Sequence, residues 1–70
     1  MKYEITLNNI TYTVGDRIKL ISMVQDPRPI APESTGVIDL IDDMNQIHVK
    51  WDCGRYLAVI PDIDSFELIR

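Results

Sequence analysis

Two short segments at the start of the chain alternate hydrophobic and polar side chains. Residues 3–7 and residues 10–14 each place a hydrophobic side chain at every second position, which is the period of a half-buried β-strand. Asn8-Asn9 joins the two segments. Because asparagine tolerates the positive φ angles that tight hairpin turns require, the pattern predicts an N-terminal β-hairpin.

The rest of the chain carries further short hydrophobic segments of the strand type, separated by turn residues. Gly15-Asp16 ends the hairpin, a polar turn covers residues 42–46, and Asp52-Cys53-Gly54 makes another turn. Residues 61–64 begin with proline and suit a single helical or 3₁₀ turn. No segment has the length and period of a helix of about ten residues. We therefore expect strands at Arg17–Met23, Val37–Ile41, Ile47–Trp51, Arg55–Ile60 and Phe66–Ile69.

All but one of the prolines fall in a single segment, Val24–Thr35. Proline has no amide hydrogen and restrains the residue before it, so neither a helix nor a central strand can pass through this segment. The segment is therefore predicted to be a long loop. Loops of this length are unusual in so small a domain, and long loops often carry function.

The predicted strands indicate an all-β fold. Many short strands in 70 residues favour a closed or nearly closed barrel, because closure hides the strand edges that otherwise aggregate. We predict a small SH3-like barrel of about five to seven short strands, with one long proline-rich loop and one short 3₁₀ turn. Trp51 is expected in the core or at its edge, because a small barrel needs its largest hydrophobic side chain inside, and the wall of a binding groove stays open as the alternative.

Composition narrows the function mainly by exclusion. The formal net charge of −4 disfavours non-specific binding to the negatively charged backbone of nucleic acids. One cysteine and one histidine exclude an internal disulfide and a Cys/His zinc site within one chain, so we expect no metal and no cofactor. No hydrophobic stretch is long enough for a membrane span, and residues 1–6 lack an apolar secretory segment. A cytoplasmic protein is therefore expected.

The negative charge is concentrated in the second half of the chain. Residues 1–35 carry four acidic and four basic residues, whereas residues 36–70 carry seven acidic residues against Lys50, Arg55 and Arg70. Two interpretations stay open for this asymmetry. The acidic residues form either a solvated face that keeps the protein soluble or a patch that meets a basic partner.

Several motifs follow one another at characteristic gaps. They are Gly15-Asp16-Arg17-Ile18, Asp26-Pro27, Thr35-Gly36 and His48-Val49-Lys50-Trp51-Asp52. In this order they resemble a bacterial family of unknown function whose members are often encoded on phages, plasmids and other mobile elements. The resemblance covers about Val14 to Ile69 and implies a small SH3-like barrel without catalytic residues. It divides the single domain of residues 1–70 into an N-terminal hairpin extension (1–14) and a family-like core (15–69).

The histidine, cysteine and aspartate residues that could take part in catalysis are not expected to have the neighbouring groups that catalysis requires. Strand alternation points His48 away from the core, and no carboxylate or nucleophile is expected beside it. Cys53 follows an acidic residue in a turn, which disfavours the thiolate, so we expect an exposed and unactivated thiol. The pairs Asp42-Asp43 and Asp62/Asp64 are better suited to solvating or capping turns than to holding a cation. We expect a protein that is not an enzyme.

Two binding hypotheses follow. The leading one is a non-catalytic module that binds an unknown protein partner through Asp26, Pro27, Arg28 and Pro29 of the loop, with Tyr56 as a neighbour. The alternative is a nucleic-acid-associated accessory protein with a local basic stripe, although the net charge disfavours nucleic acid. Either way we expect a monomer or a weak homodimer. The stripe would consist of Arg17, Lys19, Arg28 and Lys50.

Overall fold

Residues 2–69 fold into seven antiparallel strands arranged in two sheets. The structure, a computed structural model, describes residues 2–69, and it contains no helix within that range. All the predicted strands are present, and no strand end differs by more than two residues from the one expected. The strands are β1 (Glu4–Leu7), β2 (Ile10–Thr13), β3 (Arg17–Ser22), β4 (Thr35–Ile41), β5 (Ile47–Trp51), β6 (Tyr56–Val59) and β7 (Ser65–Ile69).

The N-terminal hairpin predicted from Asn8-Asn9 is confirmed. β1 and β2 form a separate two-stranded sheet, and the two asparagines have φ angles of 50° and 65°. Positive φ at both central residues is the geometry of the tight turns that follow the natural twist of a hairpin. The hairpin is tied to the main sheet by a β-bridge between Lys2 and Ile41 and by the Gly15 N–H, which donates to the Ile38 carbonyl at 2.9 Å.

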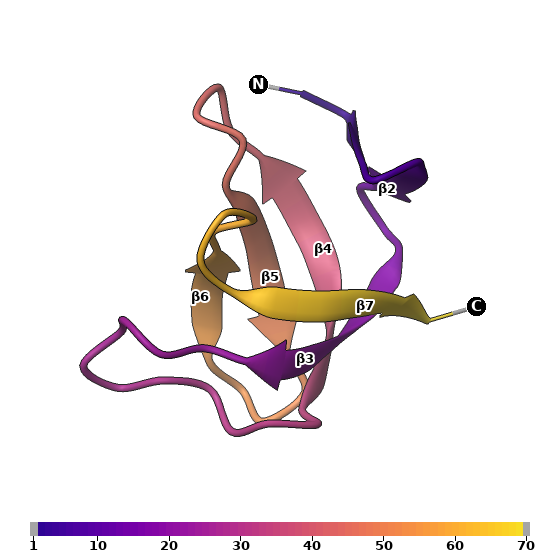
Figure 1. Cartoon of the computed structure of the whole chain (residues 1–70). Helices are drawn as coiled ribbons and strands as arrows, with labels where there is room; N and C mark the ends of the chain where they lie inside the picture. The colour runs from indigo at the N-terminus through magenta and orange to yellow at the C-terminus, as the bar shows by residue number, and fades with distance from the viewer. Residues whose placement is uncertain (1, 70) are drawn as a thin grey trace.

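The remaining strands form a five-stranded sheet in the order β6-β5-β4-β3-β7. Four strands follow one another as neighbours, and the chain then returns to place β7 beside β3. Register shifts between Ile38 and Leu40 in β4 and between Leu20 and Ser22 in β3 bend the sheet. β3 and β7 consequently cross in front of β4, β5 and β6 (Figure 1). β6 and β7 are the two edges of this sheet, and within residues 2–69 they are not paired with each other.

The core lies between the two halves of the bent sheet. In β3 and β5 buried residues alternate with more exposed ones: in β5, Ile47, Val49 and Trp51 are buried while His48 is half-buried and Lys50 exposed. Trp51 is 3% exposed, and its indole Nε1–H donates to the Leu57 carbonyl at 3.0 Å, so its predicted place in the core is confirmed. The buried hydrophobic residues are Tyr12, Ile18, Leu20, Met23, Ile30, Ile38, Ile41, Ile47, Val49, Trp51 and Val59.

A hydrogen-bonded turn joins β6 to β7 at the predicted place. The Ile63 and Asp64 amides both donate to the Ile60 carbonyl, at 3.0 and 2.8 Å. Asp64 is buried, and its Oδ2 accepts a bond from the Ile60 N–H at 2.9 Å, so the predicted capping role is confirmed for this residue. Asp62 is exposed. Among residues 2–69 there is no helix long and apolar enough to cross a membrane.

Candidate functional site

The proline-rich loop between β3 and β4 is attached to the body of the domain by backbone and side-chain contacts. Ile30 is only 3% exposed and belongs to the core. The Leu20 N–H donates to the Ser34 carbonyl at 2.8 Å, and the Leu20 carbonyl accepts from the Glu33 N–H at 2.7 Å. On the other side, the Arg55 guanidinium donates to a loop carbonyl at 3.3 Å. The loop is therefore held in place by contacts within the domain.

The four loop residues predicted to bind a partner are not equivalent. Asp26 and Pro27 line a hollow of about 200 Å³ between the loop and the end of β6. Arg28 and Pro29 are exposed but do not line this hollow. Asp26 Oδ1 also accepts a hydrogen bond from the Arg28 N–H at 2.8 Å. Asp26 therefore stabilises the conformation of the loop and also gives it a negative charge. The remaining lining residues are Met23, Gln25, Ala58, Ile60, Ile63 and Asp64.

Tyr56, the predicted neighbour of the loop, is placed elsewhere. It lies at the start of β6, and its hydroxyl donates to Asp39 Oδ2 at 2.6 Å. This bond to a carboxylate favours the protonated phenol and raises the pKa of Tyr56. Tyr56 does not line the hollow beside the loop; the residue of this segment that reaches the loop is Arg55, whose Nη1 donates to the Pro29 carbonyl.

Two of the four residues in the predicted basic stripe are engaged by acidic side chains. Arg17 Nη2 lies 2.5 Å from Asp52 Oδ2, and Lys19 Nζ lies 3.3 Å from Glu67 Oε1. The hydrogen bond from Arg17 stabilises the carboxylate and lowers the pKa of Asp52. Such pairing leaves less uncompensated positive charge for phosphates to meet.

The other two stripe residues do not lie together. Lys50 is exposed on β5, where it is the cross-strand neighbour of Val37 and Tyr56. Arg28 lies in the proline-rich loop, outside the sheet. Within residues 2–69, neither side chain forms an ion pair. The four basic residues are therefore spread over the sheet and the loop, and acidic side chains neutralise the charges of two of them.

The expectation that His48 lacks a carboxylate partner is wrong. His48 Nε2 lies 2.9 Å from Asp42 Oδ2. The other oxygen of Asp42, Oδ1, accepts hydrogen bonds from the Met44 and Gln46 N–H groups at 2.9 Å each, and these bonds orient the carboxylate. The hydrogen bond from His48 lowers the pKa of Asp42, with further help from these amides.

This pair was missed because the turn between β4 and β5 brings Asp42 back towards its own hairpin partner, which strand alternation alone does not reveal. The ring of Tyr56 also lies near His48, with 6.3 Å between the ring centroids. Neither Asp42 nor Tyr56 is a serine or cysteine nucleophile, so the cluster lacks the nucleophile–base arrangement of acyl transfer. Among residues 2–69, no group of three or more His, Cys, Asp or Glu residues is arranged to hold a metal ion.

Comparison with protein-family models finds a family that matches nearly the whole chain. A model described as "Domain of unknown function (DUF4314)" matches residues 3–69. The chain belongs to this family. Comparisons with curated proteins and with solved structures found no match. The DUF4314 match begins at residue 3, so the N-terminal hairpin lies within the matched range, whereas the resemblance noted from motifs began near Val14.

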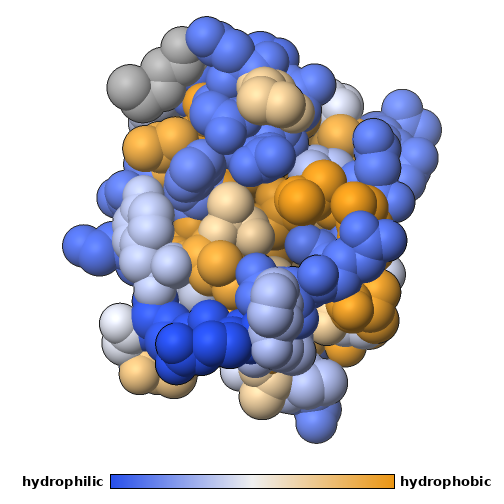
Figure 2. All heavy atoms as spheres, turned by 90° about the vertical axis from the view of Figure 1, so that its left-hand side faces the viewer, coloured by the Kyte–Doolittle hydropathy of each residue, from blue (hydrophilic) through white to orange (hydrophobic). Residues whose placement is uncertain are grey.

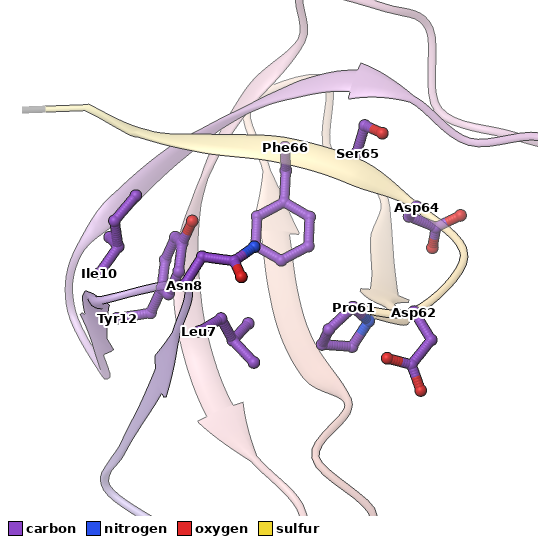
Figure 3. A pocket seen from close by; sticks show the side chains of 9 residues that line it. All are labelled: Leu7, Asn8, Ile10, Tyr12, Pro61, Asp62, Asp64, Ser65 and Phe66. Atoms are coloured by element: carbon purple, nitrogen blue, oxygen red, sulfur yellow. The ribbon is translucent and has the colours of Figure 1, made fainter.

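A second and larger hollow was not foreseen from the sequence. It has a volume of about 440 Å³ and lies between the N-terminal hairpin and the segment that enters β7 (Figure 3). Tyr12 and Phe66 meet there edge to face, with ring centroids 5.3 Å apart and planes at 65°. We call this hollow the hairpin groove. Its lining residues are Leu7, Asn8, Ile10, Tyr12, Pro61, Asp62, Asp64, Ser65 and Phe66.

Proposed function

We propose that this DUF4314 domain is a non-catalytic binding module that recognises a protein partner through the proline-rich loop and the hollow beside it. The observation that carries the proposal is the held loop itself, which brings Asp26 and Pro27 to the edge of a hollow whose other walls come from β6 and the turn after it. A concave surface bounded by a fixed loop is a common setting for recognition.

The loop is already ordered by its sequence and its contacts. Three prolines restrict the unbound backbone, and Ile30 is buried in the core. Little conformational entropy would therefore be lost when a partner binds, and this raises the affinity that a given set of contacts can reach.

The surface around the hollow combines apolar and charged groups. Val24 is 74% exposed, and Ile60 and Ile63 are each 36% exposed. Figure 2 views the side of the molecule on which the loop projects in Figure 1, and hydrophobic side chains reach the surface there between hydrophilic ones. Asp26 and Arg28 add charges of both signs. Protein interfaces commonly have this composition, with apolar contact area surrounded by polar groups.

We also infer that the bent sheet is an SH3-like barrel. The support is the strand order, in which the last strand returns beside the first strand of the sheet, and the position of the long loop directly after that first strand. The bond from the Ile63 N–H to the Ile60 carbonyl has the spacing of a 3₁₀ turn and precedes the last strand. The cytoplasmic location and the mobile-element origin stay predictions from the sequence.

The proposal is tested by affinity capture from a lysate of the native host with three versions of the domain. The loop variant carries Asp26→Asn and Arg28→Glu. Because asparagine keeps the oxygen that accepts a hydrogen bond from the backbone N–H of residue 28, the loop should retain its shape. The control variant is Lys50→Gln on the outer face of the sheet, and it changes the net charge by the same −1. Thermal melting of all three proteins confirms that each is folded.

We expect wild type and Lys50→Gln to retain the same protein partner and the loop variant to lose it. If the loop variant captures every partner that wild type captures, the proposal is wrong. Nucleic acid recovered by wild type, removed by nuclease and lost with Lys50→Gln would instead favour the basic-stripe alternative.

A further inference from the structure

The hairpin groove is bordered by an unpaired strand edge. Among the residues that the structure describes, β7 pairs with β3 alone, and its opposite edge faces the groove (Figure 3). The Leu20 backbone bonds to Ser34 and Glu33, on the side away from β7. Since the backbone groups of alternate residues in an antiparallel strand point to opposite edges, the residues of β3 that bond to β7 are Arg17 and Lys19.

This pattern decides which backbone groups of β7 remain available. Arg17 and Lys19 are the register partners of Ile69 and Glu67. The N–H and C=O groups of Phe66 and Leu68 therefore point to the open edge of β7. A row of unpaired backbone donors and acceptors is the template on which an added strand forms its hydrogen bonds.

The side chains of the groove supply apolar contacts and negative charge. Its floor and walls include Leu7, Ile10 and the Tyr12–Phe66 ring pair, and Ile10 is 39% exposed. One end carries the carboxylates of Asp62 and Asp64, and no basic side chain of the described chain lines the groove. Burial, and to a smaller extent the charge of Glu67, raises the pKa of Tyr12.

We propose that the hairpin groove binds an extended peptide segment of a partner that adds a strand to the open edge of β7, places an apolar side chain against Tyr12 and Phe66, and directs a Lys or Arg to Asp62. The peptide is expected to run antiparallel to β7, which is the more stable pairing. Because β7 begins at Ser65, next to these acids, an antiparallel peptide carries its basic residue at its carboxyl end. This site is separate from the hollow beside the proline-rich loop.

The test uses the whole chain and an acetylated, amidated peptide of eight alternating Thr and Val residues followed by Lys-Arg. Amide hydrogen exchange is followed by NMR, residue by residue. In the free protein, the amides of Phe66 and Leu68 should exchange faster than those of Glu67 and Ile69, which are bonded to β3. With about 1 mM peptide, exchange at Phe66 and Leu68 should slow by about tenfold.

Charge recognition is tested with a second peptide and a matched pair of variants. A peptide that ends in Glu-Glu in place of Lys-Arg should bind more weakly. Asp62→Asn should weaken binding of the Lys-Arg peptide by about two- to fivefold, the size of an exposed ion pair, and leave the Glu-Glu peptide no weaker. Glu33→Gln removes one carboxylate from the exposed loop, outside the groove, and should leave both affinities unchanged.

Several results would overturn the proposal. Amides of Phe66 and Leu68 that are already protected in dilute free protein would show that the edge is not open. Peptide-induced changes centred on Gln25–Pro27 and Ala58 would place the peptide in the hollow beside the loop, which would favour the proposed function and reject this site. Protection that appears with protein concentration, without peptide, would identify a second copy of the chain as the occupant of the edge.

Discussion

Truncation of Trp51 tests most directly how this small core is held together. The side chain is 3% exposed, and its Nε1–H is bonded to the Leu57 carbonyl at 3.0 Å. Trp51→Ala should lower the free energy of unfolding by about 3–5 kcal/mol, the usual cost of removing a large aromatic side chain from a core. A domain of 70 residues is expected to have a total stability of about 4–10 kcal/mol, so this variant should be close to unfolding.

Trp51→Phe separates the two contributions. Phenylalanine retains most of the buried ring area but removes the donor to the Leu57 carbonyl, at a cost of about 1–3 kcal/mol when the acceptor is left unsatisfied. If ring burial is the main contribution, Trp51→Phe should lower the free energy of unfolding by less than half as much as Trp51→Ala does.

Urea unfolding followed by far-UV circular dichroism is the suitable assay. Trp51 is the only tryptophan, so its fluorescence disappears with the substitution, whereas the strand signal remains in all three proteins. A cost below about 1 kcal/mol for Trp51→Ala would refute the core assignment, since that is the size of ordinary surface effects. Equal costs for the Phe and Ala variants would show that the hydrogen bond, and not the ring, carries the stability.

Three further predictions concern single sites. Gly36→Ala should destabilise the domain by about 1–3 kcal/mol in a urea titration followed by tryptophan fluorescence, because a Cβ there would lie 2.7 Å from the Lys50 carbonyl oxygen; wild-type stability would show that the strands can separate to admit it. Because the folded pKa of Asp42 is lowered, its stabilising contribution is present above the ordinary carboxyl range and is lost as the pH falls through the folded pKa. The melting temperature of Asp42→Asn should consequently fall less than that of wild type on acidification below about pH 4, and parallel curves would contradict the role of the His48 pair. Cys53 is exposed, so Ellman's reagent should titrate one thiol in the native protein; a thiol that reacts only in denaturant would mean that the turn is covered, for example by another copy.

The strands and turns could be predicted from the sequence because their signals are local. The alternation of Ile47, Val49 and Trp51 decides which face of β5 is buried, whatever strand lies beside it. The left-handed φ angles of Asn8 and Asn9 follow from the tolerance of asparagine for that region. Strand existence, the hairpin and the burial of Trp51 therefore needed no knowledge of the tertiary structure.

The surface could not be predicted in the same way, because it depends on which distant segments meet. Arg17 and Asp52 are 35 positions apart and become an ion pair only when β3 and β5 flank β4 in one sheet. Tyr12 and Phe66 form the floor of the hairpin groove because β7 returns beside β3 and leaves its other edge open towards the hairpin. The sequence by itself determined which residues are buried along β3 and β5, since alternation acts over neighbouring residues. Only the tertiary structure decided which charges are neutralised and where the surface is hollow, since both depend on strand order and register.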